Sequence, residues 1–213
     1  MTDQIPVLYS FRRCPYAIRA RMAIFYTRQP CNLREVILRD KPEEMLIASA
    51  KATVPVLVLG NGAVIDESLE IMHWVLAHND PESWLASPAN SDQLIKENDG
   101  PFKHHLDRYK YGTRYQGEDP GFHRTQGEAF VRKLNDILSQ TPFLTGNNIT
   151  LADIAIFPFI RQFANTDRQW FDSLNTPFLH KWLTHHLESQ LFQKVMHKYP
   201  QWKKGDEDVP FVV

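Results

Sequence analysis

The chain has 213 residues, a formal net charge of -1 and a composition that is 43% hydrophobic and 23% charged. This length suits two small domains, and this balance is typical of an ordinary soluble globular protein. The near-neutral charge argues against a general nucleic-acid binder, which needs a basic excess to neutralise phosphates. No apolar run approaches the roughly 18 residues of a membrane span, and the first residues lack a signal-peptide pattern. We therefore expect a cytoplasmic protein with neither a membrane nor a nucleic acid as partner.

The first 80 residues predict a mixed sheet flanked by helices. Short apolar runs alternate with helical patterns, and the sequence GNG marks a tight hairpin turn before the last strand. In chain order we expect strands at 5–10, 32–38, 54–59 and 63–66, helices from residue 15 and at 67–79, and a short helix or turn at 41–50. A helical crossover makes the first two strands parallel, and the hairpin makes the last two antiparallel. The order predicts an α+β, thioredoxin-like domain with a four-stranded sheet.

The helix that begins at Pro15 has apolar residues at helical spacing. Ile18 and Met22 lie four residues apart and form the expected buried face. Arg19 and Arg21 are expected to face outward.

Cys14 stands immediately before this helix, after Arg12 and Arg13. The unpaired N–H groups and the dipole of a helix N-terminus stabilise an anion, and the arginines add positive potential. Such a setting favours a reactive thiolate. The alternative is a small buried hydrophobic side chain. Cys31 has no comparable surroundings and is expected to be structural, at the other end of a helix that spans about 21 Å, too far for a disulfide.

The rest of the chain is predominantly helical. Residues 81–91 are rich in proline, serine, asparagine and aspartate and are predicted to be a linker before an all-helical domain at 92–213. The first long helix of that domain is expected to bend near Gly100 and Pro101. Thr150 and Asp153 form a capping-box pattern, so Asp153 should start a core helix rather than act as a catalytic acid.

Nine histidines raise the question of a metal site. The pairs His104–His105 and His185–His186 are adjacent, and neighbours on a helix point in different directions. There is no H-E-x-x-H motif. We therefore expect no metal.

The runs RCPYAIRARMA, KPEEM, TVPVLVL and DESLEIMHWV follow one another within the first 80 residues. In this order and spacing they resemble the N-terminal domain of a cytosolic glutathione S-transferase. They are most similar to the cysteine-type, omega-like classes, which also resemble glutaredoxins. VP followed by ES is a fairly specific signature, whereas CPYA alone is less so. The resemblance extends more loosely over the helical remainder.

The resemblance implies that Cys14 faces the sulfur of glutathione. Tyr16 would flank the tripeptide, and Lys41 would pair with its glycine carboxylate. Val54 would precede a cis Pro55, and its main chain would pair with the cysteinyl group like an added strand.

Ser68 and Glu67 would hold the other end of the tripeptide. The Ser68 hydroxyl and nearby N–H groups would bind the γ-glutamyl carboxylate, and Glu67 would pair with its ammonium group. Each residue also has a purely structural interpretation: Lys41 as a solvated lysine, Pro55 as a trans residue at a strand start, Ser68 as an N-cap, and Glu67 as an acid that favours the helix dipole. The complete set, in order and with a cysteine in the nucleophile's place, favours the functional interpretation.

Position 17 distinguishes two kinds of thiol chemistry. A dithiol glutaredoxin would have a second cysteine there, but the residue is Ala17. Reaction should therefore proceed through a mixed disulfide between Cys14 and glutathione. Other transferase classes place a serine or tyrosine near this loop, and here only Ser10 or Tyr9 could serve.

We therefore expect a glutathione-dependent thiol transferase or reductase, with glutathione as cosubstrate and a glutathionylated thiol, dehydroascorbate or another small electrophile as substrate. The alternatives are glutathione conjugation to electrophiles and a non-catalytic binding or regulatory module on the same fold. The helical domain should line the second-substrate pocket, with Tyr109 or Tyr111 facing it; a nucleic-acid stacking surface at 107–115 is the alternative. The resemblance also implies a homodimer, with Trp74 at the partner or at the interdomain seam.

Overall fold

The computed structural model describes residues 4–86 and 91–212 and divides into two compact units. Unit 1 comprises Met1–Glu82 and Gln190–Val213, and unit 2 comprises Ser83–Ser189. The predicted linker at 81–91 lies partly outside the described residues, at 87–90. We expected all of 92–213 to form the helical domain, but the described residues from Gln190 onward belong to unit 1, where the last of them form a strand of its sheet.

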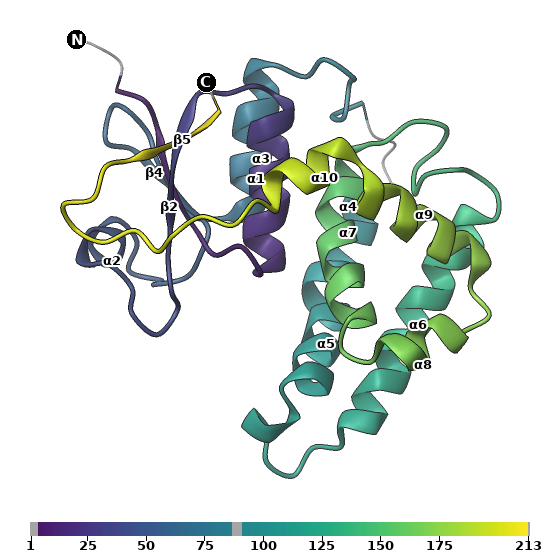
Figure 1. Ribbon diagram of the computed structural model, residues 1–213. Helices are drawn as coiled ribbons and strands as arrows, with labels where there is room; N and C mark the ends of the chain where they lie inside the picture. Colours follow the sequence, from purple (N-terminus) through teal and green to yellow (C-terminus); the bar gives the residue numbers. More distant parts are fainter. Residues whose placement is uncertain (1–3, 87–90, 213) are drawn as a thin grey trace. The chain divides into compact units, whose positions relative to one another are not determined.

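A five-stranded mixed sheet forms the centre of unit 1, in the order β4-β3-β1-β2-β5 (Figure 1). β1 (Val7–Ser10) pairs in parallel with β2 (Cys31–Glu35) and antiparallel with β3 (Val56–Val58). β3 pairs antiparallel with β4 (Val64–Ile65). The predicted thioredoxin-like arrangement of these four strands is confirmed.

The fifth strand was not expected from the sequence. β5 (Val209–Val212) pairs antiparallel with β2 and contains Pro210. Proline cannot donate to a strand ladder, and it is therefore confined to edge positions such as this one. The segment that leads into β5 is also attached to the sheet, because the Trp202 N–H donates to the Glu35 carbonyl at 2.8 Å.

Three helices pack on one another beside the sheet. α1 (Pro15–Tyr26) contacts both α3 (Ser68–His78) and α10 (Gln190–Val195). Figure 1 shows α1 and α3 on one side of the sheet and the short α2 (Glu43–Ala48) on the other. This packing leaves little of α1 in contact with solvent.

The two arginines of α1 that we expected to face outward are buried. Arg19 is 2% exposed and Arg21 is 0% exposed. Arg21 lies 3.5 Å from a Glu35 carboxylate oxygen and over the rings of Tyr199 and Phe211, which belong to the returning C-terminal segment. Burial lowers the pKa of Arg21 to about 10, against the opposing effect of Glu35. The expectation was wrong for Arg21 because the C-terminal segment covers its side of α1, and for Arg19 because its guanidinium group is directed to Ser68 at the start of α3.

Unit 2 is a bundle of helices around α7 (Leu151–Ala164). All residues of α7 except Arg161 are buried, and α7 packs against α4, α5, α8 and α9. The other helices of the unit are α4 (Ser91–Glu97), α5 (Lys103–Lys110), α6 (Pro120–Leu138), α8 (Arg168–Ser173) and α9 (Pro177–Glu188), with short turns of helix at η1 (Asn98–Phe102) and η2 (Gly112–Arg114). The π-helical turn η1 contains Pro101 and separates α4 from α5, where the sequence predicted a bend. Within the described ranges, no helix is both long and apolar enough to cross a membrane.

The predicted capping box at the start of α7 is confirmed. One oxygen of Asp153 accepts from the Thr150 N–H at 3.0 Å, and the other accepts from the Leu144 N–H and the Trp182 indole N–H, both at 2.9 Å. Asp153 is 0% exposed and thereby joins the preceding loop, α7 and α9. Its role is structural.

Candidate active site

The turn between β1 and α1 places Cys14 at the N-cap of α1. Pro15 occupies the first helical position, where its missing N–H costs nothing. The Cys14 N–H donates to the Phe11 carbonyl, and the Cys14 carbonyl accepts from the Ile18 N–H, both at 2.9 Å. The thiol is half-buried and forms no disulfide. Its sulfur therefore lies at the positive end of a helix, where a thiolate is favoured.

The loop before β3 meets this thiol. The Cys14 sulfur lies 3.7 Å from the Val54 carbonyl oxygen, and Cys14 packs against the hydrophobic cluster that contains Val54. The Val54–Pro55 peptide bond is cis, as the resemblance implied. Two of the predicted site residues are thus brought together from positions 40 residues apart.

A second group of polar side chains surrounds the N-terminus of α3. Ser68, the first residue of α3, is 3% exposed, and its hydroxyl accepts from the Arg19 Nε–H at 3.0 Å. The Arg19 guanidinium also lies over the Tyr16 ring, 5.0 Å from its centroid. A full positive charge and the positive end of a helix therefore coincide at Ser68, which makes this point attractive to an anion.

Arg19 is a site candidate that the sequence analysis missed. It lies four residues after Pro15 and three before Met22, so it shares the buried side of α1 with residues on either side. This spacing could have predicted that Arg19 is buried. Arginine side chains are seldom buried, however, so the residue type favoured a position in solvent.

Glu67 is the N-cap residue of α3, and a lysine already contacts it. Lys51 Nζ lies 2.6 Å from a Glu67 carboxylate oxygen and 2.9 Å from Asp66. Asp66 also accepts from the Ser49 hydroxyl at 2.6 Å. The Ser49 hydrogen bond, followed by the Lys51 contact, lowers the pKa of Asp66. No motif in the sequence indicated Lys51, because its partners are 15 and 16 residues away.

Lys41 is half-buried in the loop that follows β2. Within the described part of the chain, no hydrogen bond or ion pair joins it to the other predicted site residues. The structure therefore brings Cys14 together with Val54, and Tyr16 together with Ser68 through Arg19, and does not connect Lys41 to either group.

The two hydroxyl alternatives to Cys14 are enclosed. Ser10 is 0% exposed at the end of β1. Tyr9 is 3% exposed, and its hydroxyl accepts from Arg34 Nη1 at 2.7 Å. Burial raises the pKa of Tyr9, although Arg34 opposes this effect. Neither hydroxyl is placed to meet a substrate sulfur, whereas Cys14 is partly open to solvent.

Arg12 and Arg13 are held by different neighbours. The Arg12 N–H donates to a Glu35 carboxylate oxygen at 2.6 Å, and its Nη1 donates to the Met196 carbonyl at 3.4 Å. The exposed Arg13 guanidinium lies over the Phe11 ring, 5.6 Å from its centroid. The orientation of Arg12 thus depends on the returning C-terminal segment.

Cys31 has the surroundings of a structural residue. It is 0% exposed in β2, and its thiol donates to the Asn32 carbonyl at 3.3 Å. Burial raises the pKa of Cys31 from 9.0 to about 12. Its thiol therefore stays protonated under ordinary conditions.

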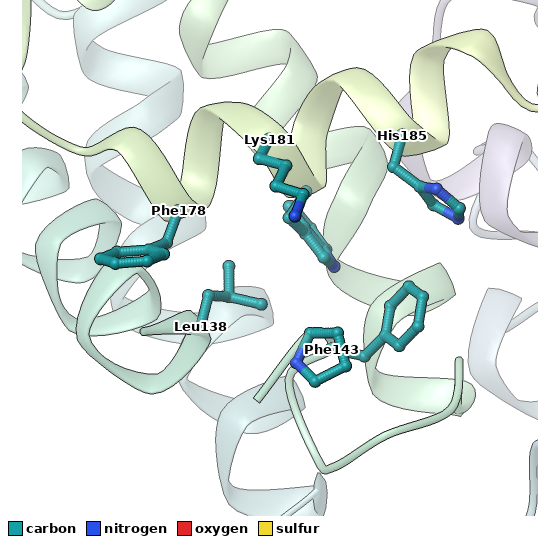
Figure 2. Close-up of a pocket in the computed structure, with 7 residues that line it drawn as sticks. Leu138, Phe143, Phe178, Lys181 and His185 are labelled. Atoms are coloured by element: carbon teal, nitrogen blue, oxygen red, sulfur yellow. The ribbon is translucent and has the colours of Figure 1, made fainter. Parts of the chain in front are cut away.

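Unit 2 contains an apolar cavity of about 150 Å³. Figure 2 shows Phe178, Lys181 and His185 projecting from α9 on one side, opposite Leu138 and Phe143. Ligand pockets usually measure about 300–1,000 Å³, so this cavity admits only a small apolar group.

The two tyrosines proposed for a substrate pocket lie elsewhere. Tyr109 packs against Phe163 and Trp170, with ring centroids 5.3 and 6.3 Å away. The ring of Tyr111 is flanked by Lys110 and Arg114. Neither tyrosine lines the cavity of Figure 2.

Two family models match the chain. A family model described as glutathione S-transferase, N-terminal domain, matches residues 8–84, and a second, glutathione S-transferase, C-terminal domain, matches residues 92–185. No curated protein matches the chain.

Solved structures share the fold at low sequence identity. A glutathione transferase family member from Pseudomonas fluorescens pf-5, with two glutathione bound, is 17% identical with a TM-score of 0.78, covering 90% of this chain and 92% of that one. A glutathione transferase from Pseudomonas putida, with one glutathione disulfide bound per subunit, is 16% identical with a TM-score of 0.77 and 90% of each chain covered. A glutathione transferase from Phanerochaete chrysosporium, in complex with oxidized glutathione, is 17% identical with a TM-score of 0.77, covering 89% and 94%.

Proposed function

The chain belongs to the glutathione S-transferase family, and from this premise we propose that it binds glutathione and transfers thiols through a mixed disulfide at Cys14. The observation that carries the proposal is the position of Cys14 at the N-cap of α1, with its sulfur 3.7 Å from the Val54 carbonyl oxygen. A structural cysteine such as Cys31 is enclosed, whereas Cys14 is partly open.

The main chain at Val54 explains how the substrate sulfur would be positioned. If the cysteinyl part of glutathione pairs with the Val54 N–H and C=O as an added strand, its side chain extends from a point next to the Cys14 sulfur. The bound glutathione and glutathione disulfide of the structurally similar transferases support this kind of ligand.

The γ-glutamyl end of glutathione would bind at α3. Its carboxylate suits the Ser68 hydroxyl, the first N–H groups of α3 and the Arg19 guanidinium, which is 3.0 Å from Ser68. Glu67 offers a carboxylate to the ammonium group, and it would exchange or share its contact with Lys51. Tyr16 would flank the tripeptide, and Lys41 would approach its glycine carboxylate.

The proposed chemistry has two thiol–disulfide exchanges. In the first, the Cys14 thiolate attacks the glutathionyl sulfur of a mixed disulfide substrate, whose S–S bond breaks as the substrate leaves as a thiolate. In the second, a glutathione thiolate attacks the Cys14-bound glutathionyl sulfur, which releases glutathione disulfide and regenerates the Cys14 thiolate. Glutathione supplies both electrons. Because position 17 is Ala17, glutathione itself must resolve the intermediate.

The N-terminus of α1 assists both steps. It stabilises the attacking Cys14 thiolate in the first step and the same group as the leaving thiolate in the second. A leaving thiol of lower pKa departs faster.

Conjugation of glutathione to small electrophiles is the alternative enzymatic function. In that reaction the glutathione thiolate attacks the electrophile directly, and Cys14 forms no covalent bond. A non-catalytic module is the second alternative. The joint presence of Cys14 at a helix N-cap beside Val54 and of the Arg19–Ser68 pair favours a catalytic protein.

Intact-mass measurement after incubation with oxidised glutathione tests the proposal. We expect one added glutathionyl group that a reductant removes, present in Cys31→Ser and absent in Cys14→Ala. Turnover with a glutathionylated peptide should be lost in Cys14→Ala, although glutathione still binds. A Cys14→Ala variant that keeps most of its thiol-transfer activity would contradict the proposal, and retained conjugation activity alone would favour the alternative enzyme.

The homodimer stays a prediction from the resemblance. The apolar residues that suggested a partner are buried within the single chain: Ile71, Met72, Leu94 and Ile95. Trp74 is half-buried, with its ring 4.6 Å from that of His78. Light scattering decides between the two states, because a mass near 24.8 kDa means a monomer.

A further inference from the structure

Three histidines of unit 2 meet where α5 and α6 pack together. His104 and His105 lie in the first turn of α5, and His123 lies in the first turn of α6. One ring nitrogen from each histidine lies within 4.8 Å of the others. The expected absence of a metal rested on adjacent histidines of one helix, whereas the third histidine of this cluster comes from another helix.

Two of the three histidines, His105 and His123, are within hydrogen-bond distance of each other. The Nδ1 atoms of His105 and His123 are 2.8 Å apart, so a proton or a cation must lie between them. Two ligand nitrogens at about 2.0–2.1 Å from an ion are about 2.9 Å apart at a right angle and about 3.3 Å apart at a tetrahedral angle. The observed 2.8 Å lies within about 0.5 Å of both values, so one ion could take the place of the shared proton in either geometry.

A carboxylate orients the buried histidine. His123 Nε2 lies 2.7 Å from Glu118 Oε2, which is also 2.6 Å from Arg108 Nε. An ionised Glu118 can only accept, so it selects the tautomer of His123 with hydrogen on Nε2 and leaves the Nδ1 lone pair directed toward His105. Metal-binding histidines characteristically donate their other N–H to such a carboxylate.

Burial differs across the cluster in the way that an accessible ion site requires. His123 is 5% exposed, His105 is half-buried and His104 is exposed, so an ion can arrive from solvent past His104.

We propose that His104, His105 and His123 bind one divalent metal ion of the imidazole-preferring group Cu²⁺, Ni²⁺ and Zn²⁺. Glu118 is a positioning residue that orients His123. The remaining coordination positions face solvent on the His104 side and would hold water. The three histidines belong to unit 2, whereas Cys14 belongs to unit 1.

Calorimetric titration of the tag-free full chain with Ni²⁺ tests the site. We expect one Ni²⁺ per chain. His104→Gln is the principal variant, because an exposed residue can be changed without disturbing the fold. His123→Gln and Glu118→Gln test the buried ligand and its carboxylate, and His185→Gln is the matched control from the other adjacent pair. Cu²⁺ electron paramagnetic resonance of a Cys14→Ser variant counts the nitrogen ligands without interference from that thiol.

The proposal predicts a distinct result for each variant. His104→Gln and His123→Gln should each weaken Ni²⁺ binding at least about tenfold, and Glu118→Gln should weaken it about 10–100-fold. His185→Gln should bind as the unmodified protein does, and the copper spectrum should show three nitrogens. Absence of saturable 1:1 binding, or unchanged affinity in His104→Gln, would overturn the three-histidine site and leave a proton-sharing pair of His105 and His123.

Discussion

Alkylation with iodoacetamide at pH 7.5 should separate the two thiols of the folded protein. Cys31 is 0% exposed, and burial raises its pKa from 9.0 to about 12. A shift of three units lowers the thiolate fraction about a thousandfold, and the greater nucleophilicity of a more basic thiolate restores only about 15–30-fold. Ionisation alone therefore slows Cys31 by about 30–60-fold relative to an ordinary exposed thiol, and enclosure slows it further.

Cys14 has the opposite surroundings. It is half-buried at the N-terminus of α1, where the helix stabilises the thiolate. We therefore expect iodoacetamide to add one carbamidomethyl group rapidly, at Cys14, and to reach Cys31 only on the timescale of unfolding. Peptide mapping at successive times measures both rates in one sample.

Two controls make the comparison decisive. In denaturant both cysteines should react, at rates within a few-fold of each other, and in Cys14→Ser the rapid phase should disappear. Reaction of Cys31 in the folded chain within about tenfold of the Cys14 rate would refute the reasoning from burial and helix position.

Three further outcomes follow from particular contacts. Ser68→Ala removes the hydroxyl beside Arg19 and should raise the KM for glutathione at least about tenfold, with little change in kcat. The reason is that a hydrogen bond to a charged group contributes about 1.5–3 kcal/mol. An unchanged KM would mean that the γ-glutamyl group binds elsewhere. Asp153→Ala leaves buried donors of Thr150, Leu144 and Trp182 without an acceptor. It should lower the free energy of unfolding, measured by urea titration, by roughly 3–5 kcal/mol. A loss below about 1 kcal/mol would contradict the structural role of Asp153. Burial lowers the pKa of His186 to about 3, so the unfolded chain binds a proton that the folded chain does not. The free energy of unfolding should therefore fall as the pH drops below about 6.5, by up to about 1.4 kcal/mol per pH unit. His186→Leu should remove that part of the pH dependence, as measured by urea titration of both proteins at pH 7 and pH 4.5.

Features encoded within a few neighbouring residues were predictable. The alternation of apolar runs with helical spacing located β1 to β4 and α1 to α3, and Pro15 marked the helix start that puts Cys14 at an N-cap. Thr150 and Asp153 predicted their own capping box, because both partners lie within one turn. Helix periodicity, capping and hairpin turns depend on contacts over at most a few residues, so a single sequence contains them.

The remaining features depend on segments far apart in the chain. β5 joins β2 across more than 170 residues and buries Arg21, which local periodicity placed in solvent. Arg19 meets Ser68 across 49 residues, and His105 meets His123 across 18. Each partner is ordinary in its own sequence context, and only packing brings the charges and ring nitrogens within hydrogen-bond distance. The position of Cys14 at a helix start was therefore local information, whereas the surroundings of Cys14, Ser68 and His123 were decided by tertiary structure, because burial and charge pairing are set by the elements that cover a residue.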